Sequence, residues 1–340
     1  MANMYALMCV HRLLQDIMEN DRPFGGKVIV LGGDFRQVLP VVPHASRATA
    51  IKNSIKFSPL WSVFNILKLT ENMRAEAEEK EFADFLLKIG NGTYPCSDSD
   101  NEVIIELPPS MLSTDIITDI YGENFSSPED VIQFSKVAIL APKNDHCREI
   151  NEKILNLIPG ELKTYKSVNR LITENDEVLQ FPVEFLDSLE LTGLPPHTLN
   201  LKVGCIVLLL RNLNVALGLL NGTCLVVRQM YTNALDLEVI TGLQIGRRVL
   251  LPRIDLSPAD STLPFSFKRR QFPIRLAFCM TINKAHGQTL EKVGIFLPEP
   301  VFSHGQLYVA MSRARSFHNV RIQVQNGGYR TANVVWKEVL

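Results

Sequence analysis

The sequence lacks paired cysteines. Its six cysteines stand singly, with no C-x-x-C pair that would indicate a zinc site and no spacing typical of a disulfide framework. We therefore expect a protein of a reducing compartment: the nucleus, or alternatively the mitochondrion or cytoplasm. No apolar run approaches the roughly 20 residues that cross a bilayer, and the acidic start of the chain is unlike a secretory signal. We expect neither a membrane partner nor secretion.

The sequence also lacks an excess of either charge. Lys and Arg number 35 against 36 for Asp and Glu, which leaves a net charge of -1. A generally basic surface is excluded, so any nucleic acid must be bound by a local groove. With 46% hydrophobic and 21% charged residues over 340 positions, the composition is that of a globular protein of two or three domains.

Apolar periodicity predicts the elements of the first part of the chain. Apolar residues recur at helical spacing from Met4 to Met18 and from Glu76 to Ile89. The apolar run Val28 to Leu31, between glycines, predicts a strand buried on both faces of a parallel sheet. Gly32-Gly33-Asp34 follow its tip, where open α/β sheets bind ligands. Residues 93–130 are expected to be a polar connection.

A second α/β unit is predicted to begin with a strand from Val137 to Leu140 and a helix from Asn144 to Ile158. The pattern then changes to short β-type runs with a turn signal at Asn221-Gly222, which predicts a small inserted β-barrel. These runs are residues 203–210, 223–230, 235–240 and 247–254. The α/β pattern resumes in residues 274–281, 293–297, 305–313 and 320–324.

Two motifs in the first part carry polar and charged side chains. Gly32 to Pro40 contains Asp34, Arg36 and Gln37, and a glycine-rich strand-to-loop turn would explain it equally well. The motif Leu-Thr-Glu-Asn-Met-Arg ends at Arg74, and a strand end with a surface arginine is its simpler interpretation. Neither motif alone establishes a function.

Two further motifs lie near the C-terminus. Thr281 to Leu290 gathers Lys, His, Gln and Thr around one glycine directly after an apolar strand, and a structural turn rarely needs so many different donors. Tyr308 to Arg315, reading Tyr-Val-Ala-Met-Ser-Arg-Ala-Arg, lies on a predicted helix. Two arginines on a helix are ordinarily just solvated.

Taken in this order, the four motifs resemble those of the PIF-type (petite integration frequency) ATP-dependent DNA helicases, the 5′-to-3′ group of superfamily one that includes the RecD proteins and the Helitron helicases. The strand that ends in Ala141-Pro142-Lys143-Asn144 and the run Leu201 to Gly204 fit the same family. The resemblance extends from the first residue to about Gln325. It implies an α/β fold of two RecA-like, P-loop-NTPase-type domains, the first one incomplete, with a small SH3-like β-barrel inserted in the second.

The resemblance also implies a division into domains. Residues 1–92 would be a remnant of the first RecA-like domain, and residues 93–130 a connection. Residues 131–202 and 271–340 would form the second RecA-like domain, with 203–270 as the β-barrel insert. ATP would bind between the RecA-like domains, and single-stranded DNA would cross both.

On the family's template Gln37, Arg74 and Arg313 would be catalytic. Gln37 would sense the γ-phosphate or the attacking water, and the two arginines would reach the same phosphate from different domains, so that hydrolysis opens and closes the cleft. Phosphoryl transfer depends mainly on positioning and charge neutralisation, and an arginine finger adds about 10³ to 10⁵ in rate. The residues implied to bind ATP are Asp34, Gln37, Arg74, Gly287, Gln288 and Arg313.

The expected partners are single-stranded DNA and DNA duplex junctions, and we expect a monomer. A single strand is held by cationic and hydroxyl contacts to phosphates together with stacking platforms, and Lys284 fits the first role. The residues implied to bind DNA are Pro40, Asn144, Thr281, Lys284 and His286.

The implied function is that of an ATP-dependent DNA helicase, which couples ATP hydrolysis to translocation on single-stranded DNA and to duplex unwinding in repair, recombination and telomere maintenance. The alternative is a catalytically inactive, truncated or transposon-derived remnant that at most binds single-stranded DNA. An unrelated α/β protein with chance motifs is a third hypothesis, and it would require Arg74 and Arg313 to lie far apart.

One motif of the family is missing from these 340 residues. The loop G-x-x-x-x-G-K-[ST], whose backbone and lysine hold the phosphates, does not occur. The acidic pair that holds Mg²⁺ would precede the first helix and is missing too, so we assign no metal ligand. We expect that the chain starts at an internal methionine of a longer gene, through a shortened gene model or in a decayed mobile element.

The isolated chain should therefore have negligible ATPase activity, even with Mg²⁺ and single-stranded DNA. Its arginines can only assist a phosphate that another element has bound. A coupled assay of phosphate release in the presence of single-stranded DNA measures this. Robust turnover by this chain alone would contradict the prediction.

Overall fold

The computed structural model describes residues 2–42, 45–69, 79–99, 102–122, 134–172, 181–191, 193–258 and 265–340. Packing divides the chain into two compact units. Unit 1 comprises residues 1–116, 140–142 and 281–340, and unit 2 comprises residues 117–139 and 143–280. Residues 281–340 pack with the first segment of the chain, and the predicted division, which placed residues 271–340 with 131–202, stays a prediction.

Both helices predicted in the first part of the chain are present in unit 1. α1 spans Met4–Met18 and begins at Asn3, whose side chain accepts a hydrogen bond from the Ala6 N–H at 2.8 Å. α3 spans Lys80–Asn91 and ends at Gly92, which adopts the left-handed conformation. The start predicted at Glu76 lies outside the described residues. The apolar face of α3 is buried as expected, through Phe82, Phe85, Leu86 and Ile89.

The prediction of a buried strand from Val28 to Leu31 is wrong. These residues belong to no strand, and the side chains of Val28 and Val30 are 92% and 89% exposed. In a second segment without regular structure, residues 65–69, Leu67 and Leu69 are 89% and 98% exposed. An apolar run is buried as a parallel strand only where neighbouring strands and covering helices surround it, and no described strand pairs with either segment.

The prediction of a polar connection over residues 93–130 is wrong for its described part. β1 (Cys96–Ser99) pairs antiparallel with β2 (Glu102–Glu106), and β17 (Arg330–Ala332) pairs antiparallel with the other side of β2. α4 spans Ile116–Tyr121. The partner strand β17 comes from the far end of the chain, so no local sequence pattern predicts this sheet.

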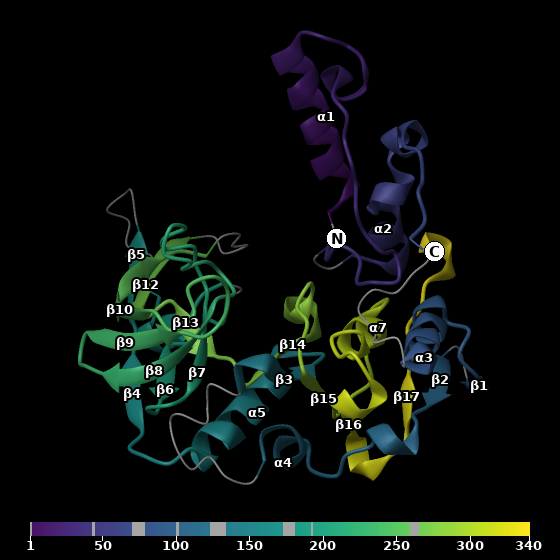
Figure 1. Ribbon diagram of the computed structural model, residues 1–340. Helices are drawn as coiled ribbons and strands as arrows, with labels where there is room; N and C mark the ends of the chain where they lie inside the picture. Colours follow the sequence, from purple (N-terminus) through teal and green to yellow (C-terminus); the bar gives the residue numbers. More distant parts are fainter. Residues whose placement is uncertain are drawn as a thin grey trace. The chain divides into compact units, whose positions relative to one another are not determined.

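A parallel pair of strands lies at the centre of unit 1. β15 and β16 run parallel with Ile295 opposite Ile322, in a sheet of order β14-β3-β15-β16 (Figure 1). Only Leu140 and Ala141 of β3 belong to unit 1. The bounds are β3 Val137–Ala141, β14 Cys279–Thr281, β15 Lys292–Leu297, β16 Val320–Val324, α2 Arg47–Lys52 and α7 Gln306–Met311.

Unit 2 contains the predicted helix and the predicted β-rich region. α5 spans Asn144–Leu157, and the Asn151 side chain on it bonds both the carbonyl and the N–H of Cys279, at 2.8 and 2.9 Å. Five antiparallel strands follow the order β10-β9-β8-β7-β13 (Figure 1). Their bounds are β7 Ile206–Leu209, β8 Cys224–Met230, β9 Ala234–Val239, β10 Arg248–Pro252 and β13 Ile274–Leu276.

Two smaller antiparallel sheets, β11-β12-β5 and β4-β6, complete the strands described in unit 2. The helix α6 lies between β5 and β6 in the sequence. Over the described residues, no helix has both the length and the apolar character needed to span a bilayer. The bounds are β4 Lys163–Lys166, β5 Val168–Ile172, α6 Val183–Ser188, β6 Thr198–Leu201, β11 Ile254–Leu256 and β12 Ser266–Gln271.

The loop of residues 32–40 in unit 1 is held by the residues that lead into α7. His304 is fully buried: its Nε2 lies 2.7 Å from the Phe35 carbonyl oxygen, and its Nδ1 accepts from the Trp336 N–H at 2.8 Å. These partners assign the proton of the neutral ring to Nε2. Gly305 has φ +72°, and a Cβ there would lie 2.2 Å from the Arg36 carbonyl oxygen, so only glycine fits.

The first turn of α7 holds the same loop through a side chain. The Tyr308 hydroxyl donates to Asp34 Oδ2 at 2.8 Å, while Asp34 Oδ1 accepts from the Arg36 N–H at 3.0 Å. The Arg36 Nε in turn donates to the Asn91 side-chain oxygen at 2.7 Å, at the end of α3. The loop is therefore fixed to two helices of unit 1.

Acid should weaken this anchor through His304. Burial lowers the pKa of His304, because desolvation disfavours the charged ring. A lowered folded-state pKa means that the stabilisation is present above the unfolded-state value of about 6.5 and is lost as the pH falls below it, at up to about 1.4 kcal/mol per pH unit. Urea unfolding between about pH 8 and about pH 5 measures the effect.

His304→Gln removes this titration, so its stability should fall less between those two pH values than that of the unchanged chain. His318→Gln is the matched control, because His318 is an exposed histidine of the same unit. Equal pH dependence of the unchanged chain and His304→Gln would contradict the role of His304.

Tyr308→Phe should lower the free energy of unfolding by about 1.5 to 3 kcal/mol, the range for a hydrogen bond to a charged group. Burial and the neighbouring Asp34 charge raise the pKa of Tyr308. Its contribution is therefore present below the unfolded-state pKa of about 10 and is lost as the pH rises further. The difference from the unchanged chain should stay constant at neutral pH and shrink in strong alkali. Tyr329→Phe, whose ring is 49% exposed, should change little.

Candidate functional site

Three of the four predicted motifs come together in unit 1. The loop of residues 32–40 contacts α7 through Tyr308, and α7 leads directly to Arg313. Arg313 in turn contacts the motif Thr281 to Leu290. The remaining motif extends into residues 70–78, so Arg74 lies outside the described residues. The candidate site is therefore the junction of the loop, α7 and the segment that follows β14.

Arg313 is the most buried charged group of this junction, with 1% exposure. Its Nε donates to the Val309 carbonyl at 2.9 Å, its Nη1 to the Gln288 carbonyl at 3.1 Å, and its Nη2 to the Ser312 hydroxyl at 2.8 Å. In addition, the Leu290 N–H donates to the Arg313 carbonyl at 3.0 Å. Arg313 thus ties the C-terminal motif to the Thr281 motif. A phosphate contact would require the guanidinium to exchange some of these carbonyls, and its catalytic role stays a prediction.

The Thr281 motif forms a short turn of 3-10 helix at Ile282–Ala285, which exposes Lys284 and His286 beside Gly287. Gly287 has φ +80°, and a Cβ there would meet no atom within 4 Å, so open space surrounds its backbone. Gln288 is half-buried, and its carbonyl is occupied by Arg313. The motif therefore offers a cation, an imidazole and an approachable main chain on one exposed turn.

Charged residues of the other two motifs affect the pKa of His286. Desolvation lowers its pKa, the positive charge of Arg313 acts in the same direction, and the negative charge of Asp34 opposes both. A neutral imidazole is favoured at neutral pH, and it can donate a hydrogen bond to an anion without adding charge. The three motifs thus share one electrostatic environment.

The remaining predicted residues are less closely associated. Gln37 is half-buried, and its N–H closes a turn on the Asp34 carbonyl at 3.1 Å. Pro40 follows buried Leu39, which packs on Ile51 and Val339. Asn144 is exposed at the start of α5 in unit 2, so it does not share a unit with the other predicted residues.

Sequence reasoning missed the residues that hold the junction together. His304 and Gly305 precede the C-terminal motif, and no role was predicted for Tyr308 within it. Single histidines and glycines carry no periodic signal, and their partners are backbone carbonyls far away in the sequence. Only Gly305 gives a weak signal in the sequence, because glycine is the residue that most readily adopts a positive φ.

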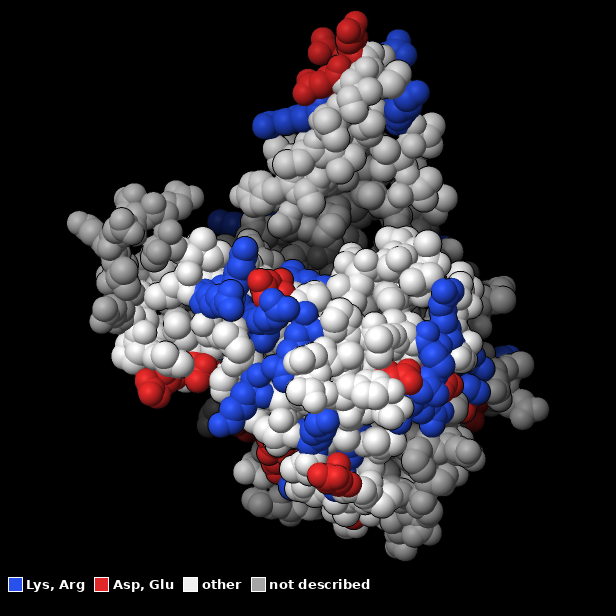
Figure 2. Space-filling view, turned by 90° about the vertical axis from the view of Figure 1, so that its left-hand side faces the viewer, with Lys and Arg blue, Asp and Glu red and all other residues white. Residues whose placement is uncertain are grey.

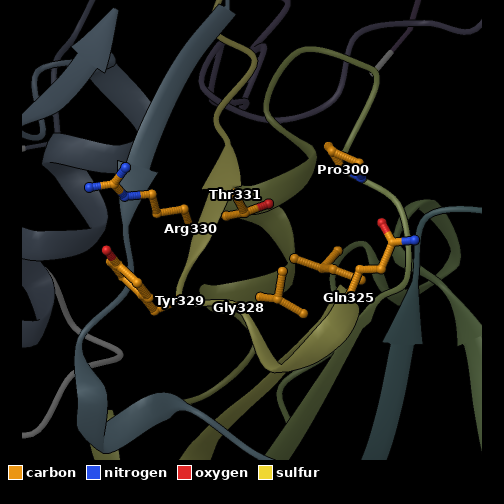
Figure 3. A pocket seen from close by; sticks show the side chains of 8 residues that line it. Pro300, Gln325, Gly328, Tyr329, Arg330 and Thr331 are labelled. Atoms are coloured by element: carbon orange, nitrogen blue, oxygen red, sulfur yellow. The ribbon is translucent and has the colours of Figure 1, made fainter. Parts of the chain in front are cut away.

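A pocket of about 310 Å³ lies elsewhere in unit 1, beyond the carboxyl ends of β15 and β16 (Figure 3). The Thr331 hydroxyl in its wall is buried and has no hydrogen-bond partner among the described residues. None of the predicted site residues lines this pocket, so it is separate from the motif junction. Its lining residues are Leu297, Pro300, Val324, Gln325, Gly328, Tyr329, Arg330 and Thr331.

The chemistry available at the junction is anion binding by cations and N–H donors. Over the described part of the chain, no group of three or more His, Cys, Asp or Glu could hold a metal ion. Phosphate held here would contact Lys284, His286 and the main chain at Gly287.

Two family profiles match the chain. The profile described as PIF1-like helicase matches residues 1–100, and that of the DNA helicase Pif1 2B domain matches residues 184–230. The ATP-dependent DNA helicase PIF1 of Xenopus laevis is 28% identical over 308 residues, which cover 89% of this chain and 42% of the relative. The human protein of the same name is 26% identical over 306 residues, covering 90% and 42%. The chain thus spans less than half the length of these relatives.

Solved structures agree on the fold. The Pif1 helicase of Candida albicans has a TM-score of 0.64 at 23% identity, covering 100% of this chain and 73% of that one. A Bacteroides Pif1 helicase in complex with ADP-AlF3 and single-stranded DNA has a TM-score of 0.64 at 21% identity, covering 100% and 70%. The predicted fold class, with two RecA-like domains, is confirmed. The motifs, the family profiles and the fold agree in their similarity to the PIF1-like helicases.

Proposed function

We propose that this chain is the part of an ATP-dependent DNA helicase that couples nucleotide hydrolysis to movement along single-stranded DNA and to duplex unwinding. The observation that carries the proposal is the junction in unit 1, where Arg313 ties the C-terminal motif to the Thr281 motif beside the Asp34 loop. Motifs that act on nucleotide and on DNA must be connected rigidly if a change at one is to move the other.

In this proposal each motif has one task. Gln37 and Asp34 lie on the loop that senses the nucleotide, and Arg313 neutralises the phosphate after it releases part of its carbonyl contacts. Lys284 and Thr281 contact the DNA backbone. His286 and Gly287 couple this DNA contact to the phosphates of the bound nucleotide. Arg74 would supply the second arginine, and Asn144 and Pro40 would border the DNA track.

ATP with Mg²⁺ is the proposed substrate. The phosphate-binding loop and the acidic pair that hold this substrate in the family do not occur in these 340 residues. The residues present here would therefore complete a nucleotide site rather than form it alone. We propose a role in DNA repair, recombination or telomere maintenance in the nucleus, with the helicase part of a Helitron-type mobile element as the alternative origin.

A second candidate function is a catalytically inactive remnant that only binds single-stranded DNA. Two observations favour it: the aliphatic side chains of Val28 and Val30 are almost fully exposed, and Arg313 is already occupied by backbone carbonyls. DNA binding is common to both candidates, so it is the property to test first.

Binding to a single-stranded oligonucleotide should weaken with salt, because each neutralised phosphate contributes about 0.7 to the slope of log K against log salt concentration. Lys284→Ala should lower that slope by about 0.7. Fluorescence anisotropy at several salt concentrations measures both quantities.

Lys337→Ala is the matched control, since Lys337 is an exposed lysine of unit 1 outside the motifs. Its slope should equal that of the unchanged chain. A flat salt response of the unchanged chain would remove the DNA-binding proposal, and an equal effect of the two lysine variants would remove the specific role of Lys284.

A further inference from the structure

The three-stranded sheet β11-β12-β5 of unit 2 has one covered and one open face. On the covered face, Leu171 and Phe267 pack in an apolar cluster. Arg269 on the same face is 1% exposed and donates to the carbonyls of Leu186 in α6 and of Pro195. This buried arginine is bound by carbonyl groups of the fold, so it is not available to a partner.

The open face carries cations on neighbouring strands. Alternation along β12 turns Lys268 and Arg270 outward, and alternation along β5 turns Arg170 outward. The register places Lys268 directly opposite Arg170 and places Arg270 opposite Val168. Three exposed cations therefore share one face of two paired strands.

Direct opposition of like charges destabilises a sheet. Among the described residues, no carboxylate forms an ion pair with Lys268 or Arg170, and Arg270 has only the long contact of 3.9 Å to Asp255. Strand formation alone gives no reason for such a pair, since a polar uncharged residue would fit the same position. An anionic partner would turn the repulsion into a favourable contact.

Two further cations precede strands of this sheet in the sequence: Lys166 lies two residues before β5, and Arg253 lies one residue before β11. Lys166 at the end of β4 is exposed, and its carbonyl accepts from Arg253 Nη1 at 2.9 Å. The Arg253 guanidinium lies over the Tyr165 ring at 5.4 Å and over the Phe272 ring at 5.3 Å, which holds it in place. Figure 2 shows Lys and Arg side chains gathered on the side of the protein that it presents, with smaller groups of Asp and Glu among them.

We propose that this face, defined by Arg170, Lys268 and Arg270, binds the phosphate backbone of duplex DNA. The outward residues of the three strands include no aromatic side chain among those described, so the face offers no platform on which an unpaired base could stack. Cations without stacking platforms suit a partner whose bases are already paired and whose phosphates are exposed. The contact would be independent of DNA sequence.

This surface belongs to unit 2, whereas Lys284 and Thr281, which are proposed to contact a single strand, belong to unit 1. It therefore adds a second DNA contact to the proposed function. The single-strand contact and the duplex contact can be tested independently of each other. Loss of single-strand binding in Lys284→Ala would say nothing about duplex binding at Lys268.

The test uses the full chain with the triple substitution Arg170→Gln, Lys268→Gln and Arg270→Gln. Fluorescence anisotropy is measured with a blunt duplex and with a single strand of the same length. Each lost phosphate contact lowers the duplex slope of log K against log salt by about 0.9, so the triple variant should lose about 2.7. Between about 50 and about 200 mM salt, its duplex affinity should then fall about fortyfold less than that of the unchanged chain. The single-strand slope should stay the same.

The matched control replaces three cations of unit 2 that are paired with carboxylates: Arg148→Gln, Lys153→Gln and Arg248→Gln. It changes the net charge equally and should keep the duplex slope. A second triple variant, Arg170→Lys, Lys268→Arg and Arg270→Lys, keeps the charge and should bind as before, which separates charge from folding. The proposal is overturned by an unchanged duplex slope, by an equal loss in the control, or by an equal loss of single-strand binding.

Discussion

The fixed position of the loop of residues 32–40 on α7 is the constraint on which the functional part of unit 1 depends. A neutral imidazole bridges this loop and the C-terminal segment, a glycine allows the two backbones to touch, and a tyrosine holds the Asp34 carboxylate. The contacts with Asp34, Phe35 and Arg36 join residues near the start of the chain to residues near its end. The motifs can therefore meet only in the folded chain, where a few directional hydrogen bonds connect them.

Local pattern was sufficient for the three longest described helices and for the β-rich part of unit 2. α1, α3 and α5 follow from helical spacing, and the strands β7 to β10 follow from short β-type runs, because those signals depend on neighbouring residues alone. Burial of a strand depends instead on what lies beside it, which explains the failure at Val28 to Leu31. For the same reason the sheet of β1, β2 and β17 could not be predicted, as its third strand comes from the distant end of the chain.

The site was predictable to the level of motifs, but not to the level of geometry. The family resemblance named Arg313, and the structure places it between two motifs, yet its carbonyl partners at Val309 and Gln288 follow from backbone positions that no sequence pattern encodes. The sequence also does not predict that Lys268 lies opposite Arg170, because this depends on the register of β12 against β5. A shift of β12 by one residue would turn Lys268 to the other side of the sheet and leave Arg170 in place.

The exposed aliphatic side chains of Val28, Val30, Leu67 and Leu69 have a practical consequence for handling the protein. Extended apolar segments without neighbours are templates for intermolecular pairing, and excluded salts such as sulfate strengthen the association of apolar surfaces. Self-association would therefore increase in concentrated sulfate or phosphate buffers, where attraction to phosphates is also screened. Buffers of low salt concentration would reduce self-association of the chain. They would also preserve its electrostatic attraction to nucleic acid, so the same buffer suits both properties.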